Sequence, residues 1–469
     1  MKPPETGAYR ANLRPVQLFN LAFGVAIGVG WIMVMGIWLS AAGPLGAALA
    51  FAVAAMAMLT IGSAYASVAI EHPLPGGEFA YARRSFGMGA AFWVGWFLAF
   101  AYVVVIAFEI VSVAWLAREL VPALPAAPER GFDLPGLAIG GSILLAVIAF
   151  NLRGARAAAR LQDVLVLLKI LLSTGLIVAG FALGDFANLQ PLWGSHESGS
   201  PLRGMLVVLA MAPFFYAGFG VVAQALGDVQ TPATIRALPR VMVFAILGTM
   251  LFYGLIILAS AAAAPRQIIL DASLPAAAAF GFAFGTGGSA EAVLILGLLG
   301  LLTILNGLYF AAVRLIQALA QNGLVPGAMG RIHASAGISV STGIFVALSS
   351  MMLAALGKTM LAPLVNITSM AFAGVMGVVC AVLIHQRRAA GCAPVRLISP
   401  AIGGLLALLM VAVTASETFA ATEAPVPPEW IVIACAVLVG LLLRSMTAKR
   451  WRGHRPNDFR SGENRSGEN

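Results

Sequence analysis

Apolar residues occur in long continuous stretches along the chain, and short polar segments that carry most of the charges separate them. A helix needs about twenty apolar residues to cross the roughly 30 Å of hydrocarbon in a membrane, and these stretches reach that order of length. The pattern predicts an all-α polytopic membrane protein of about twelve transmembrane helices. The predicted spans are 16–40, 43–70, 88–117, 136–151, 161–184, 203–226, 240–262, 289–322, 340–356, 360–386, 398–415 and 429–446.

Composition agrees with a chain whose main solvent is lipid. Of the 469 residues, 60% are apolar and 10% are charged, whereas a soluble domain has roughly 25% charged residues. The first apolar stretch is longer than the h-region of a signal peptide and no cleavage site is obvious, so the first helix is expected to be retained. No polar segment inside 15–446 is long enough to separate soluble domains, so one membrane domain is predicted.

The basic residues are distributed unevenly between alternate loops. With the N-terminus in the cytoplasm, the inner segments hold most of them, including Arg83, Arg84 and the cluster from Arg444 onward. The outer loops then hold only Arg118, Arg130, Arg203, Arg266 and Lys358. By the positive-inside rule, this predicts a multi-pass protein of the inner (plasma) membrane with both termini in the cytoplasm. The net charge of +9 reflects this topology, and no nucleic-acid partner is predicted.

Residues typical of enzymes and metal sites are scattered. The cysteines form neither a disulfide framework nor a metal-binding spacing, and the histidines form no catalytic arrangement. These residues are Cys380, Cys392, Cys435, His72, His196, His333, His385 and His454. The sequence Gly357-Lys358-Thr359 lacks the first glycine of a P-loop, because Met352 stands there. The chain is therefore not expected to be an enzyme, to carry a cofactor or metal, or to be driven by ATP.

Glycines interrupt the first and sixth predicted helices at corresponding places. Gly24, Gly28 and Gly30 lie in the first helix, and Gly218 and Gly220 lie in the sixth. Broken helices at the start of two five-helix halves are typical of inverted-repeat transporters, in which unwound backbone at mid-membrane contacts the substrate. The alternative is that Gly24 and Gly28 form a small-xxx-small helix-packing motif.

These observations divide the chain into four parts. The predicted parts are a cytoplasmic N-terminus at 1–15, an inverted-repeat transporter core of ten helices at 16–386, two accessory helices at 398–446 and a disordered cytoplasmic tail at 447–469. The tail ends in a repeated Arg-Ser-Gly-Glu-Asn sequence, which is too polar to form a core.

Four segments resemble, in order, motifs of the amino acid–polyamine–organocation superfamily. They are Ile27-Gly28-Val29-Gly30-Trp31-Ile32 in the first helix, Glu71 to Tyr81 after the second, Gly218-Phe219 followed by Asp228 to Pro232 around the end of the sixth, and Arg314 to Pro326 at the end of the eighth. The resemblance covers residues 13–386. The chain departs from the family pattern at Val29, where serine is usual, and at Gly220 and Gly227, where glutamates are usual.

The resemblance implies a five-plus-five inverted repeat, as in LeuT-like transporters, with two further C-terminal helices. It also implies a small-molecule substrate, an amino acid or amine, held between helices one, three, six and eight. Bacterial amino acid permeases are the most similar group. Ethanolamine permeases also resemble the chain from Trp31 to Gly87.

The substrate contacts that the resemblance implies lie at the two helix breaks. In transporters of this architecture, the amides of a half-helix face a carboxylate and nearby carbonyls accept the substrate ammonium. Carried over to this chain, these are the backbone groups of Ile27, Gly28, Val29 and Gly30. The corresponding stretch of helix six is Phe214, Phe215, Tyr216, Ala217 and Gly218, whose rings would close the site from water or pack against an ammonium. The alternative is that Phe214 and Phe215 face lipid or a neighbouring helix.

Lys169 is predicted to lie within the fifth helix, where an unpaired ammonium in hydrocarbon is costly. In some proton-coupled relatives, a lysine of this helix takes the place of a sodium ion, and Lys169 resembles it. A fixed positive charge would repel sodium, so the position predicts coupling to protons. The alternative is that Lys169 reaches the cytoplasmic interface.

Glu109 is the acid deep in the third helix, and Tyr102 lies seven residues earlier on nearly the same face. Together they are predicted to line the substrate site, with Glu109 favouring an amine or relaying protons. The alternative is a hydrogen-bonded structural acid. Asn306 and Tyr309 of the eighth helix either contact substrate or join helices. Nearer the inner surface, Arg314, Asp228 and Glu71 are candidates for a gate or a static ion pair.

The sequence therefore predicts a secondary transporter of amino acids or small amines that works by proton-coupled symport or exchange and alternating access. An ethanolamine- or polyamine-type permease is one alternative, and a non-transporting amino acid sensor on the same scaffold is another. The substrate, the direction of transport, the coupling ion, the gate pairs and the oligomeric state stay open.

Overall fold

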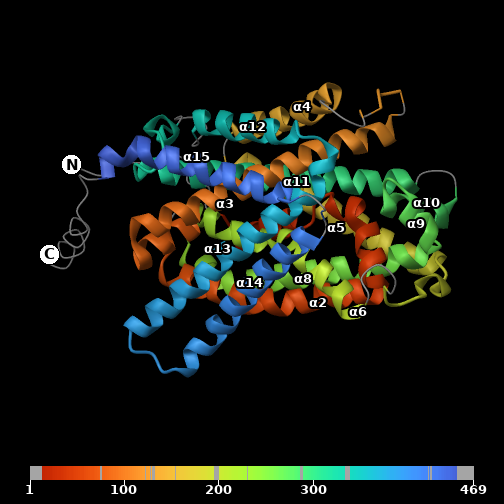
Figure 1. The fold of residues 1–469 in the computed structure, drawn as a ribbon, viewed down its shortest axis with the longest axis horizontal. Helices are drawn as coiled ribbons and strands as arrows, with labels where there is room; N and C mark the ends of the chain where they lie inside the picture. Colours follow the sequence, from red (N-terminus) through yellow and green to blue (C-terminus); the bar gives the residue numbers. More distant parts are fainter. Residues whose placement is uncertain are drawn as a thin grey trace.

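The computed structural model describes residues 13–451 except 74–75, 122, 127, 129–132, 154, 195–199, 230, 286–288, 333–338, 421 and 423–424. All regular structure in these residues is helical (Figure 1). The α-helices are α1 (Pro15–Ala26), α2 (Gly30–Glu71), α3 (Gly77–Leu120), α4 (Leu134–Asn151), α5 (Ala155–Leu183), α6 (Pro201–Tyr216), α7 (Gly218–Ala225), α8 (Pro232–Ala263), α9 (Arg266–Asp271), α10 (Pro275–Phe284), α11 (Ser289–Gln321), α12 (Val340–Ala354), α13 (Leu361–Ala389), α14 (Val395–Ala420) and α15 (Pro428–Trp451). The 3-10 helices are η1 (Phe186–Leu189), η2 (Leu226–Asp228), η3 (Gly327–Gly330) and η4 (Lys358–Met360).

The helices confirm the predicted class of fold. Ten of those in the described part of the chain are long and apolar enough to cross a membrane. The 42-residue α2 bends at Gly43, whose φ of 71° ends one helical segment before Pro44 starts the next. With this division and the 15-residue α12, the helices match the twelve predicted spans. Helices dominate because, in lipid, backbone polar groups must pair within their own segment.

Gly43 illustrates why the chain can turn sharply between two crossings. A β-carbon at this position would lie 2.5 Å from the amide nitrogen of Gly194 and 2.7 Å from the carbonyl oxygen of Leu192. A residue with a side chain would therefore meet both a disfavoured backbone angle and the backbone of the 192–194 segment. A similar change of direction occurs in α3 at Gly87, whose φ is 81°, so a short helix over 77–86 precedes the predicted span from residue 88.

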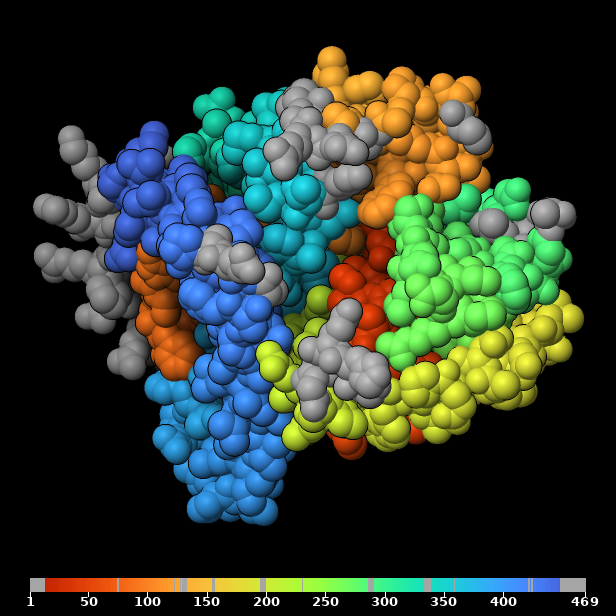
Figure 2. Space-filling model, turned by 45° about the vertical axis from the view of Figure 1, so that its right-hand side comes forward, coloured from red at the N-terminus to blue at the C-terminus, as the bar shows by residue number. Residues whose placement is uncertain are grey.

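The helices at the centre of the bundle are the first crossings of the chain together with α6, α7 and α11. α2 packs along α6 and α8, and α3 packs along α11 and α13, whereas α14 and α15 are largely exposed. In the space-filling view, the red N-terminal helices show only small areas between the surrounding helices (Figure 2). The broken helices are thus enclosed by the rest of the fold.

One end of the bundle, here called the terminal end, holds the start of α1 and the end of α15. There the Leu13 amide donates to the carbonyl of Asp228 over 3.1 Å, and the Thr447 hydroxyl donates to the carbonyl of Leu324 over 3.4 Å. The helix α15 continues to Trp451, five residues past its predicted end at Met446. The remainder of the predicted tail lies outside the described residues.

Candidate substrate site

The first helix is broken at mid-length. α1 ends at Ala26 and α2 begins at Gly30, and the residues between them leave the helical path, with Ile27 at φ −113° and ψ 93°. The break leaves carbonyl groups at the end of α1 and amide groups at the start of α2 without helical partners. The predicted interruption at Gly28 is therefore present, and it creates polar backbone inside the apolar core.

Lys169 of α5 fills the carbonyl side of this break. Its ammonium donates to the carbonyls of Gly24 over 2.9 Å and Ile27 over 2.7 Å, and to the hydroxyl of Thr303 over 2.9 Å. The side chain is 1% exposed. Lys169 therefore does not reach the membrane surface; instead its side-chain nitrogen lies in an oxygen cage formed by α1, the break after it and α11.

A further donor completes this side of the break. The Tyr253 hydroxyl of α8 donates to the carbonyl of Ala26 over 2.8 Å. The Thr303 hydroxyl also donates to the Gly24 carbonyl over 2.9 Å. Sequence patterns gave no sign of Thr303 or Tyr253, because neither is charged and both lie in otherwise regular helices.

Glu109 of α3 lies on the other side of Gly28. It is fully buried, and neither carboxylate oxygen has a hydrogen-bond partner among the described residues. A β-carbon on Gly28 would lie 2.8 Å from Oε1 of Glu109, which places the carboxyl beside the break. A buried, unpaired acid is costly, so this group is available to a ligand or a proton.

The second break, between α6 and α7, is much smaller. Only Ala217 separates Tyr216 from Gly218, and its φ of −60° and ψ of −20° remain in the helical region. Gly218 serves close packing here: a β-carbon on it would lie 2.0 Å from the carbonyl oxygen of Ala22. Both glycines allow a close approach, but Gly28 lies in an unwound segment whereas Gly218 lies at a contact between α7 and α1.

A small cavity lies between the two breaks, and its walls are apolar. It has a volume of about 10 Å³ and is lined by Val25, Ala26, Gly28, Gly30, Val105, Phe214, Phe215, Ala217, Ile304, Leu308 and Phe372. A space of this size holds at most about one water molecule, so it is too small for an amino acid. The rings of Phe214 and Phe215 are 4.9 Å apart in an edge-to-face contact. Both rings face the core, not lipid.

The structure places the other predicted contacts around this cavity. Ile27 and Val29 belong to the break but do not line the space, and Gly218 packs against α1. The Tyr216 hydroxyl donates to the carbonyl of Phe51 over 2.9 Å, away from the cavity. Tyr102 does not line the cavity, but the centroid of its ring lies 5.9 Å from that of Phe372, which does.

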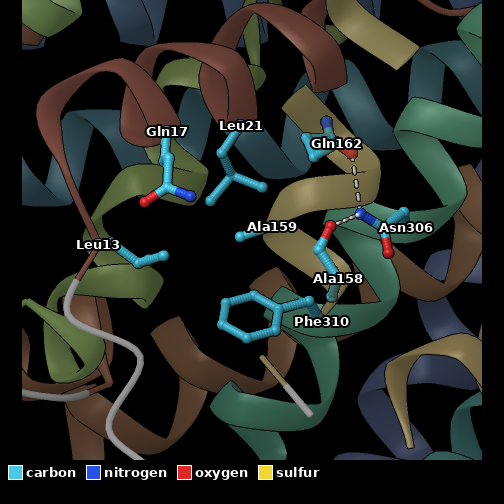
Figure 3. A pocket seen from close by; sticks show the side chains of 8 residues that line it. All are labelled: Leu13, Gln17, Leu21, Ala158, Ala159, Gln162, Asn306 and Phe310. Atoms are coloured by element: carbon cyan, nitrogen blue, oxygen red, sulfur yellow. Dashed lines mark hydrogen bonds between the residues drawn. The ribbon is translucent and has the colours of Figure 1, made fainter. Parts of the chain in front are cut away.

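Asn306 lies in a separate polar cluster. Its amide donates to Oε1 of Gln162 over 2.9 Å and to the carbonyl of Ala158 over 3.1 Å, and its oxygen accepts from Asn151 over 2.9 Å. These bonds join α4, α5 and α11, and Figure 3 shows the two that Asn306 donates beside a pocket of about 30 Å³. In this conformation Asn306 holds helices together.

A second acid, Glu78, lies buried near the start of α3. Its carboxylate accepts a hydrogen bond from the amide of Gln224 on α7 and bonds with the hydroxyl of Tyr65 on α2. Oε1 lies 3.4 Å from where a β-carbon of Gly220 would stand. Glu78 therefore occupies space beside the position where the resembling family carries a glutamate. Its role was not predicted, because Glu78 was only one residue of the segment from Glu71 to Tyr81 that resembles the superfamily.

We expect that moving the glutamate from position 78 to position 220 restores part of the stability that either substitution alone removes. Glu78→Ala should lower stability by about 1–3 kcal/mol, because it leaves the Gln224 amide buried and unpaired. Gly220→Glu alone should be worse, because it places a second acid beside the first. The double variant Glu78→Ala/Gly220→Glu should melt at a higher temperature than either single variant in detergent. Simple additivity of the two losses would contradict this assignment.

Of the three candidate gate charges, two pair with each other at the terminal end. Arg314 Nη2 lies 3.0 Å from Oδ2 of Asp228. The Asp228 carboxylate is almost fully buried, and Glu71 is exposed at the end of α2. The pair connects α11 with the segment after α7.

The bundle of apolar helices, the unwound first helix and the enclosed site define a multi-pass membrane transporter. Residues 13–442 match the family described as amino acid permease, and the chain belongs to that family. It is 27% identical to the branched-chain amino acid permease BcaP of Bacillus subtilis (76% of this chain, 77% of the relative). It is 26% identical to the methylthioribose transporter (69% and 70%) and 25% identical to the amino-acid permease RocC (68% and 68%) of the same organism. The resemblance noted in the sequence is confirmed, and the chain is a transporter, not an enzyme.

Proposed function

We propose that this permease carries an amino acid with an apolar side chain across the inner membrane by proton-coupled symport or exchange. The observation that carries the proposal is the oxygen cage at the first helix break, which Lys169 occupies. A metal cation bound at this place would need the same carbonyl and hydroxyl oxygens. Because the Lys169 ammonium already binds these oxygens, the site is not free for sodium. This supports a proton as the coupling ion.

The coupling step follows from the cage. While it is charged, Lys169 binds the carbonyls of Gly24 and Ile27 and holds α1 against α5 and α11. Loss of its proton weakens these hydrogen bonds, because charge-assisted bonds are roughly twice as strong as neutral ones. α1 can then move away from α5, which would open the site toward the terminal end. With both termini in the cytoplasm, this is the inward-open state.

Substrate recognition is proposed to use the remaining groups of the break. The first amides of α2, at the positive end of its dipole, suit a carboxylate. The unpaired carboxyl of Glu109 suits an ammonium. The Phe215 and Ile304 side chains leave an apolar wall for the substrate side chain. Because the cavity holds only about 10 Å³, these groups must separate before a substrate enters, which supports alternating access.

A small amine is the second candidate substrate. The observation in its favour is Glu109, whose buried and unpaired carboxyl offers oxygen acceptors to an ammonium, whereas the carboxylate contact relies on backbone amides alone. Alanine, valine, leucine, ethanolamine and putrescine distinguish the two classes. Each would be tested for stabilisation of the purified protein, since a ligand that binds the folded state raises its melting temperature.

Uptake into proteoliposomes then tests transport. The stabilising compound, labelled with ¹⁴C, should accumulate when the lumen is alkaline relative to the medium, and a sodium gradient should have no effect.

Gly28→Ala should prevent both stabilisation and uptake, since its β-carbon would stand 2.2 Å from Cδ1 of Ile304 and beside Glu109. Gly374→Ala, where no atom lies within 4 Å, is the control. Stabilisation without uptake would favour a sensor, and sodium-driven uptake would contradict the proposal.

A further inference from the structure

A large apolar cavity lies outside the substrate site. It has a volume of about 540 Å³ and is lined by residues of α3, α11, α12, η4 and α15. Trp96 and Phe100 of α3 form its floor, Phe345 and Ser349 of α12 form one wall, and Cys435 of α15 forms the other. In Figure 1 the ribbon of α15 runs beside α3 and α12.

One of the contacts between α15 and the rest of the bundle lies at the edge of this cavity. The indole Nε1 of Trp96 donates to the carbonyl of Ala436 over 2.9 Å. Gly440 allows this approach, because a β-carbon there would lie 2.8 Å from the same nitrogen. Residues of α15 between Pro428 and Val439 line the cavity together with residues of α12 between Phe345 and Leu353.

The mouth of the cavity faces the membrane. Met352 and Ile431, which line it, are 70% and 55% exposed. Around a membrane-spanning bundle, such exposed apolar side chains meet acyl chains. Water is a poor occupant, because a buried water needs two to four polar partners and this lining is almost entirely apolar. An empty space would deprive every lining atom of its dispersion contacts.

We propose that this cavity binds one acyl chain of a membrane lipid, in the half of the membrane away from the terminal end. The hydrophobic effect does not drive this binding, since lipid tails are as apolar as the lining. The favourable contribution is the packing of one chain against walls on three sides. A helix of a second copy, about 10–12 Å across, is too thick to enter a space of this volume.

The experiment uses proteoliposomes that contain a phosphatidylcholine with a diazirine near the end of one acyl chain. After irradiation, labelled peptides are identified by mass spectrometry. Wild-type protein should carry label on the α12 and α15 residues that line the cavity. Ser349→Trp, which fills the cavity from α12, should reduce that label at least fivefold. Leu348→Trp is the matched control, because Leu348 is the adjacent residue, is 66% exposed and lies outside the lining.

Ala99→Phe fills the same cavity from α3 and provides an independent test if Ser349→Trp does not fold. Cross-linking of the unlabelled protein, carried out in parallel, measures association between copies. Equal lipid labelling of wild type and both filled variants would overturn the proposal. A filled variant that loses a dimer while lipid labelling stays unchanged would also overturn it and assign the surface to a second copy.

Discussion

Lys169→Met is expected to abolish proton-driven accumulation, with uptake at least about 100-fold below wild type. Methionine keeps the volume and the apolar stem but removes the ammonium that three oxygens accept from. Two backbone carbonyls and one hydroxyl then lose a charge-assisted bond, which is worth about 1.5–3 kcal/mol in each case. Because methionine cannot gain or lose a proton, the pH gradient can then no longer drive substrate accumulation.

Substrate binding should survive the same substitution. The Lys169 side chain does not line the central cavity, so ligand-induced stabilisation should change by no more than about tenfold in affinity. Leu168→Met is the control, since the preceding residue is 46% exposed and faces away from the cage. If the Lys169→Met variant still accumulates substrate when the lumen is alkaline, a residue other than Lys169 couples transport to protons.

The second large effect is expected at Gly218. Gly218→Ala places a methyl group 2.0 Å from the Ala22 carbonyl and 2.6 Å from the Ala26 amide nitrogen, both backbone atoms of α1 that cannot rotate away. Overpacking of this kind costs about 3 kcal/mol. The melting temperature in detergent should fall by roughly 5 °C or more.

Gly254→Ala is the matched comparison for this substitution. Gly254 also lies in a membrane-spanning helix, but no atom stands within 4 Å of its would-be β-carbon. Its melting temperature should stay close to that of wild type. Equal losses for the two variants would mean that the α1–α7 contact does not set the effect, since helix propensity alone favours alanine over glycine.

The crossings were predictable because lipid imposes a simple rule on the sequence. Every apolar stretch of sufficient length became a helix, and Gly28 marked the true break in the first one. The short helix before Gly87 and the helices α9 and α10 were missed, because they carry no long apolar stretch. Their presence depends on packing against the crossings.

The site was only partly predictable. Lys169 and Glu109 were predicted because ionisable side chains inside the membrane are energetically costly and usually have a functional role. The sequence could not reveal that Lys169 binds carbonyls of a helix 142 residues away. Apolar lining residues such as Ile304 and Phe372 look like any other core residue. Tyr102 shares a helical face with Glu109 but does not line the cavity; its ring packs near Phe372, which does.

The measurement that most directly tests proton coupling follows the proton itself. Proteoliposomes loaded with the pH-sensitive dye pyranine receive the stabilising substrate from outside, with no sodium present and the membrane potential clamped by potassium and valinomycin. The account predicts that the lumen acidifies on addition of substrate with wild-type protein and does not with Lys169→Met. Substrate entry at a constant luminal pH in wild type would contradict it.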